Sequence, residues 1–105
     1  MSLVRACAVT DVPADAAIAV TVDGTPVAIA RDGEDFYAIY DECSHAAVPL
    51  SEGEVEGHEI ECWLHGSMFD LRTGKPTGLP ATEPVAIYPV TVQGEDVLVD
   101  VQAPY

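Results

Sequence analysis

The stretch CSHAAVPLSEGEVEGHEIECWLHG, residues 43–66, carries two short motifs of cysteine and histidine. The first is Cys43-Ser44-His45, and the second, after a gap of sixteen residues, is Cys62-Trp63-Leu64-His65. Residues typical of turns flank both motifs. The motifs therefore predict two loop tips, a first tip at residues 43–45 and a second tip at residues 62–65, which the rest of the chain holds side by side.

Two thiolates and two imidazoles in one place would suit three kinds of site. A structural zinc ion takes such ligands in tetrahedral geometry, and a [2Fe–2S] cluster also accepts two cysteines with two histidines. A catalytic Cys–His pair is the third interpretation, but it leaves half of these residues unexplained and lacks an orienting third group. Cys-x-His spacing is unusual for zinc. Gly66, directly after His65, indicates a turn whose backbone N–H groups point at cluster sulfurs.

The remaining sequence predicts short strands separated by turns. Asp23-Gly24 is a two-residue hairpin signal, and Pro89 predicts an edge or a bulge in its strand. Residues 51–57 are rich in turn formers, and residues 76–84 are stiff and non-regular because they contain three prolines. We expect strands at residues 3–9, 17–22, 26–31, 36–40, 58–62, 67–71, 85–92 and 97–101. This pattern predicts an all-β protein, an antiparallel β-sandwich or barrel.

Size and charge limit the functions that the chain can have. Its 105 residues predict a single domain, 1–105, with a core that needs no disulfide. The net charge of −14 disfavours binding to nucleic acid or to an anionic membrane, and it favours a protein partner with a basic face. No apolar run reaches membrane-spanning length, and the N-terminus lacks a signal segment. We expect a cytoplasmic protein, with the remaining cysteine, Cys7, as a buried inert thiol.

The two motifs together, Cys43-Ser44-His45 and Cys62-Trp63-Leu64-His65-Gly66 with sixteen residues between them, resemble the Rieske pattern. Gly78-Leu79-Pro80 resembles the third, proline-bearing loop that covers the cluster in that family. The resemblance implies the Rieske iron–sulfur fold, with a cluster-binding subdomain at about residues 42–84. It also implies that Cys43 and Cys62 hold one iron of a [2Fe–2S] cluster, and that His45 and His65 hold the other. The residues that it places around the cluster are Ser67, Gly66, Leu64 and Pro80.

The chain departs from the Rieske proteins of respiratory complexes at three positions. Val48 and Leu64 stand where that branch has two cysteines in a disulfide, so no such bridge can form. Phe69 stands where that branch has a tyrosine that donates to a ligand sulfur, whereas Ser67 matches a serine that could still donate to a bridging sulfide. With one hydroxyl missing and many acids nearby, we expect a low reduction potential, toward roughly −150 mV.

The pattern is similar to the small soluble Rieske ferredoxins of bacterial aromatic-ring dioxygenase systems. That resemblance implies a one-electron carrier between a flavin-dependent reductase and a terminal oxygenase. Such a carrier is not itself an enzyme and has no small-molecule substrate. Two alternatives remain: a Rieske carrier for another pathway, such as cluster assembly or a monooxygenase, and a zinc-stabilised interaction module.

The expected docking surface surrounds the two ligand histidines. Its residues are His45, His65, Ala46, Ala47, Val48, Glu42 and Pro80. Between Arg31 and Arg72 the sequence has eleven acids and no lysine or arginine. Two interpretations of these acids remain: some of them form a negative collar that attracts a basic partner, or they are the solvated surface of a β-sheet.

Overall fold

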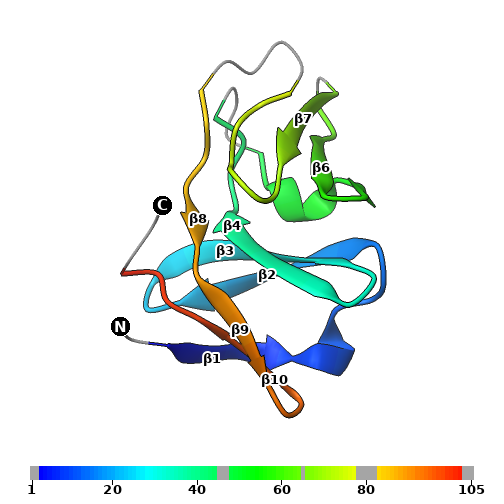
Figure 1. The fold of residues 1–105 in the computed structure, drawn as a ribbon. Coiled ribbons are helices and arrows are strands. Elements are labelled where there is room, and N and C mark those ends of the chain that lie inside the picture. The colour runs from blue at the N-terminus through cyan, green and yellow to red at the C-terminus, as the bar shows by residue number, and fades with distance from the viewer. Residues whose placement is uncertain (1–2, 45–47, 65, 78–82, 103–105) are drawn as a thin grey trace.

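The computed structural model describes residues 3–44, 48–64, 66–77 and 83–102. These residues form three antiparallel sheets stacked in layers (Figure 1). The base sheet has the order β1-β10-β9, the central sheet β2-β3-β4-β8 and the tip sheet β5-β6-β7. The strands are β1 (Val4–Ala8), β2 (Ala16–Val22), β3 (Thr25–Asp32), β4 (Asp35–Tyr40), β5 (Val55–Glu56), β6 (Glu59–Cys62), β7 (Ser67–Asp70), β8 (Ile87–Tyr88), β9 (Val90–Gln93) and β10 (Asp96–Val99).

Two single-turn 3₁₀ helices, η1 (Val9–Asp11) and η2 (Leu50–Glu52), complete the regular structure of these segments. The prediction of an all-β fold is confirmed. Within the described ranges, no helix is long and apolar enough to cross a membrane.

The central sheet is built on a tight hairpin between β2 and β3. Val22 pairs with Thr25, so that Asp23 and Gly24 alone make the turn, with φ values of 49° and 79°. Two consecutive positive φ values are the mark of the turn that matches the natural twist of a hairpin. The hairpin predicted from Asp23-Gly24 is confirmed.

Both faces of strand β3 are buried in its central part, because all four residues from Val27 to Ala30 are fully buried. Val27 and Ile29 belong to the base core, which also contains Cys7, Val12, Val22, Ala38, Tyr88, Val97 and Val99. Ala28 and Ala30 belong to the cysteine core, which also contains Ile39, Cys43, Leu50, Val55, Ile60, Cys62, Phe69, Leu71 and Val85. The alternation of side chains along β3 therefore supplies both cores of the molecule.

The chain changes sheets at Pro89. β8 pairs with β4 in the central sheet, and β9, which starts one residue after Pro89, pairs with β10 in the base sheet. The prediction had one strand over residues 85–92 with an edge or a bulge at Pro89. The prediction of a continuous strand is wrong, since proline has no N–H for the ladder and the strand breaks there. The carbonyl of Pro89 instead accepts a hydrogen bond from the N–H of Asp100 at 3.1 Å.

The segment 51–57, predicted only as turns, contains more structure than expected. It holds the end of η2 and the two-residue strand β5. Val55 is buried in the cysteine core although it is the single apolar side chain of this polar segment, and Leu50, at the start of η2, is buried in the same core. A single buried residue leaves no periodic signal, so the sequence pattern does not reveal these elements.

We predict that Gly74→Ala destabilises the protein more than Gly94→Ala. Both glycines have a positive φ, of 78° and 62°, so each alanine costs about 1 kcal/mol of backbone strain. A Cβ atom at Gly74 would in addition overlap the carbonyl of Val85, whereas Gly94 has nothing within 4 Å. We expect Gly74→Ala to lower the free energy of unfolding by about 2 kcal/mol more than Gly94→Ala. Denaturant unfolding of both variants measures the difference, and equal losses would contradict the close packing of Gly74.

Candidate metal centre

The two motif cysteines lie far apart in the sequence but in the same core. Cys43 follows the end of β4, and Cys62 is the last residue of β6. Their exposed fractions are 2% and 0%, and both belong to the cysteine core. The predicted convergence of the two tips is therefore seen for both sulfur-bearing residues.

The first tip is closed at its base by backbone hydrogen bonds. The N–H of Glu42 donates to the carbonyl of Tyr40 at 2.9 Å, which turns the chain sharply out of β4. The N–H of Cys43 then donates to the carbonyl of Val48 at 3.0 Å. Val48 is half-buried against the cysteine core. The predicted site residues between them, His45, Ala46 and Ala47, lie outside the described residues.

The second tip is the bend of the β6–β7 hairpin, as predicted. Cys62 pairs with Ser67 at the end of the ladder, and the N–H of Gly66 donates to the carbonyl of Cys62 at 2.8 Å. Trp63 and Leu64 stand out at this bend with exposed fractions of 47% and 42%. The predicted ligand His65 lies outside the described residues.

Ser67 and Phe69 share a face of the tip sheet with Cys62. Cys62 pairs with Ser67 and Ile60 pairs with Phe69, and alternate residues of a strand point to the same side. All four side chains are fully buried. The hydroxyl of Ser67 and the ring of Phe69 therefore lie on the same side of this sheet as Cys62.

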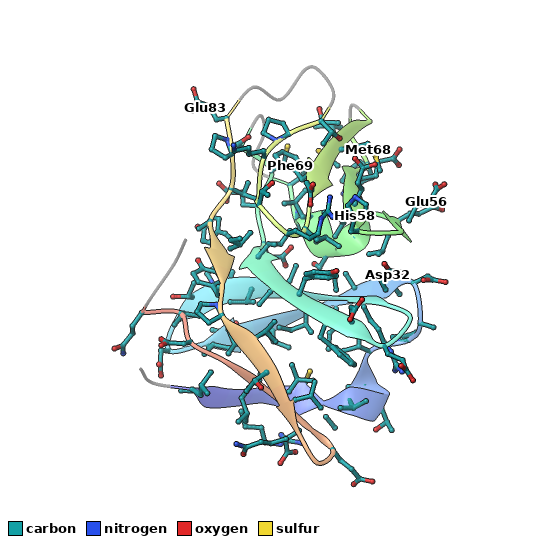
Figure 2. All side chains as sticks on the ribbon, viewed as in Figure 1. Asp32, Glu56, His58, Met68, Phe69 and Glu83 are labelled. Atoms are coloured by element: carbon teal, nitrogen blue, oxygen red, sulfur yellow. The ribbon has the colours of Figure 1, made fainter. Side chains whose placement is uncertain are left out.

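The proline-rich segment runs from the second tip region to the first. Pro76 forms a bridge with Phe69, and the N–H of Thr77 donates to the carbonyl of Met68 at 2.7 Å. At the other end, the hydroxyl of Ser44 donates to the carbonyl of Glu83 at 2.5 Å. Figure 2 shows Glu83 at the same end of the molecule as the β6–β7 hairpin. Pro80, predicted to lie near the cluster, is outside the described residues.

Acidic side chains occupy the outer face of the tip sheet. Glu56 lies opposite Glu59, and Glu59 lies opposite Asp70. Like charges in directly opposed positions destabilise a sheet. Asp70 is neutralised by Arg72, whose guanidinium lies 3.2 Å from the carboxylate and holds the pKa of Asp70 below its usual range. Figure 2 shows Glu56 pointing away from the body of the protein, so this face presents negative charge to solvent.

The structure also reveals a contact that the sequence pattern missed. The carboxylate of Asp41 accepts one hydrogen bond from the N–H of Ser51 and another from its hydroxyl, both at 2.7 Å. The carboxylate of Asp41 is therefore held by Ser51 in a half-buried position. The contact spans ten residues. No short motif signals it, because side-chain caps usually act over two or three residues.

The two predicted ligands that the structure describes, both cysteines, fit a metal centre. Two thiols are buried at the bases of two adjoining tips, which is the sulfur half of the predicted ligand set. Among the described residues no group of three or more His, Cys, Asp or Glu side chains gathers to hold a metal ion. This is consistent with the prediction, because both predicted histidine ligands lie outside those residues.

Comparison with known proteins identifies the family. The Rieske [2Fe-2S] domain model matches residues 2–89. The 3-phenylpropionate/cinnamic acid dioxygenase ferredoxin subunit of Shigella boydii serotype 4 (strain Sb227) is 45% identical over 102 residues, which cover 95% of this chain and 94% of that protein.

Two solved structures agree with this match. The ferredoxin of carbazole 1,9a-dioxygenase from Nocardioides aromaticivorans IC177 has a TM-score of 0.89 and 42% identity, with 94% of this chain and 97% of that chain covered. A second structure is a complex of reduced oxygenase and oxidized ferredoxin in carbazole 1,9a-dioxygenase. It has a TM-score of 0.85 and 37% identity, with 92% of this chain and 91% of that chain covered. The family is defined by a [2Fe–2S] cluster with two cysteine and two histidine ligands, so zinc is not the resident metal. The chain belongs to the Rieske [2Fe–2S] family, and it is similar over nearly its full length to the ferredoxins of dioxygenase systems.

Proposed function

We propose that this protein carries single electrons from a flavin-dependent reductase to the terminal oxygenase of a multicomponent aromatic-ring dioxygenase. One observation carries the proposal. Cys43 and Cys62 converge in a buried core, while Trp63 and Leu64 are exposed at the bend that follows Cys62. An electron carrier needs a cofactor that is protected from water on one side and accessible to partners on the other. The similarity to dioxygenase ferredoxins supports the same conclusion.

The proposed ligands are Cys43 and Cys62 for one iron and His45 and His65 for the other. They lie in a cluster-binding subdomain of about residues 42–84 within one domain. When bound, the cluster supplies a one-electron redox couple. The chain keeps the sulfur side dry with large apolar residues, since Leu50 and Phe69 are fully buried in the same core as both cysteines. The proposed neighbours of the cluster are Ser67, Gly66, Leu64 and Pro80.

We predict that the three cysteines differ completely in their importance for the cofactor. Cys43→Ser and Cys62→Ser should abolish the visible absorption and the rhombic EPR signal of the reduced protein. Cys7→Ala should leave both signals intact, because Cys7 lies in the base core, away from the cysteine core. Burial also raises the pKa of the Cys7 thiol, which keeps it protonated and unreactive at neutral pH. Loss of colour in Cys7→Ala, or its retention in both serine variants, would contradict the proposed ligands.

We predict a midpoint potential below zero, toward roughly −150 mV, and a rise in potential for Phe69→Tyr. The added hydroxyl would lie on the sheet face that Cys62 and Ser67 share, and a donor to a sulfur stabilises the reduced, more negative cluster. Phe36→Tyr is the matched control, because Phe36 is a half-buried ring that packs against the base core. Spectroelectrochemical titration measures the midpoint potentials of the wild type and of both variants. A positive wild-type potential, or a fall in potential for Phe69→Tyr, would count against this account.

The proposed docking surface surrounds the two histidines and comprises His45, His65, Ala46, Ala47, Val48, Glu42 and Pro80. Of these residues the structure describes Glu42, which is exposed, and Val48, which is half-buried. With a net charge of −14, the protein should approach a basic partner faster than a neutral protein would.

We predict that the reduced protein restores oxygenase turnover, with a rate that falls as salt increases. The test replaces the native ferredoxin in reconstituted 3-phenylpropionate and carbazole dioxygenase systems and measures product formation. Glu42→Gln should lower the rate at low salt by about twofold. Glu95→Gln, which removes one charge from the β9–β10 turn at the opposite end of the fold, should not (Figure 1). If neither oxygenase accepts electrons while their own ferredoxins succeed, a carrier role in another pathway is favoured. A rate that does not depend on salt would remove the electrostatic part of the proposal.

A further inference from the structure

We propose that Asp41 is a positioning residue that fixes the first cluster cysteine, Cys43, relative to the second, Cys62. This inference rests on the proposed function, because it assigns a role to Asp41 in holding the cluster site. Asp41 lies between the end of β4 and Cys43. Its own N–H donates to the carbonyl of Pro26 at 3.1 Å, so its backbone is anchored on β3. Cys43 lies two residues further on, so its backbone follows closely on a residue that is fixed to the central sheet.

The carboxylate of Asp41 reaches across the first tip to the helix η2. Both of its oxygens are occupied by Ser51, one by the backbone N–H and one by the hydroxyl, each at 2.7 Å. A short helix usually receives such a bond from the side chain of its own N-cap residue. In η2 the N-cap is Pro49, which makes no side-chain cap hydrogen bond. Asp41 thus supplies the missing cap from outside the helix, in a partly buried position where a charge-assisted hydrogen bond is strong.

The far end of η2 lies against the strand that carries Cys62. The N–H of Gly53 donates to the carbonyl of Leu50 at 3.0 Å and closes the helix. A Cβ atom at Gly53 would overlap the carbonyl of Glu61, the residue before Cys62. The N–H of Glu61 in turn donates to the carbonyl of Glu54 at 2.9 Å. The distance between η2 and β6 is therefore set by backbone contacts rather than by adjustable side chains.

These contacts form a short continuous connection between the two cysteines. It runs from Cys43 through Asp41 to Ser51, and from there through the Gly53–Glu61 contact to Cys62. Removing the carboxylate leaves the N–H of Ser51 in a partly buried place without its acceptor, which is costly. The bond from Cys43 to Val48 still closes the first tip, but it does not connect that tip to β6. We therefore expect the separation of the cysteines to become variable.

The test compares three variants of the cluster-loaded protein. Asp41→Ala should speed the bleaching of the visible absorption by EDTA about tenfold and broaden the EPR lines, since both hydrogen bonds to Ser51 are lost. Asp41→Asn should stay within about twofold of wild type, because its oxygen still accepts from the Ser51 N–H and its amide donates to the Ser51 hydroxyl. Ser51→Ala removes one of the two bonds and should fall between them. It also carries the test if Asp41→Ala does not fold.

Asp11→Ala is the matched control. The carboxylate of Asp11 likewise accepts a backbone hydrogen bond, from Ala8 at 3.0 Å, but it lies beside β1 of the base sheet. This variant should lower the melting temperature and leave the bleaching rate and the EPR lines unchanged.

Three results would overturn the inference. The first is wild-type behaviour of both Asp41→Ala and Ser51→Ala. The second is equal impairment of Asp41→Asn and Asp41→Ala, which would indicate an effect of charge. The third is the same cluster loss in Asp11→Ala. If the wild-type protein itself lacks a Rieske EPR spectrum, the proposed function fails instead.

Discussion

Strand β3 is buried on both faces, and the two cores of this protein depend on that constraint. Val27 and Ile29 face the base core, whereas Ala28 and Ala30 face the cysteine core. The two pairs of side chains differ in size, and each size suits the core that it faces. Large side chains fill the space between two stacked sheets, and small ones let the short tip sheet and η2 approach the central sheet closely. On the cysteine side β3 presents only the methyl groups of Ala28 and Ala30, while the neighbouring β4 adds the large side chain of Ile39.

The features that the sequence predicted are those set by short-range chemistry. Asp23-Gly24 predicted its hairpin because two positive φ values are needed there, and the second tip was predicted as a bend between two strands. The change of sheet at Pro89 was not predicted beyond an irregularity, because it depends on which strands lie nearby. The burial of Val55 was missed for the same reason, since a single apolar residue among polar ones leaves no local pattern.

The candidate site likewise has features that the sequence predicted and features that it did not. Spacing alone identified Cys43 and Cys62, and the structure places both in one core. The hydrogen bonds between Asp41 and Ser51 join residues that are ten positions apart. No recurring motif signals such bonds, so only the structure reveals them. The acids were predicted as a group, but their surroundings in the fold differ: Asp41 is half-buried and held by Ser51, Asp70 is paired with Arg72, and Glu56 lies opposite Glu59. The fold tolerates the repulsion between Glu56 and Glu59 at this solvent-facing side of the tip sheet.

The pairing of β1 with β10 has a consequence for how the chain acquires its shape. Arg5 and Asp96, which are 91 positions apart, are joined by a 2.8 Å hydrogen bond between these strands. Contacts of such long range slow folding, because a large loop must close before they form. The hairpins β2–β3–β4 and β6–β7, in contrast, join neighbours in the chain. During synthesis, the strands that carry and support the cysteines can therefore pair while the base sheet still awaits its final strand.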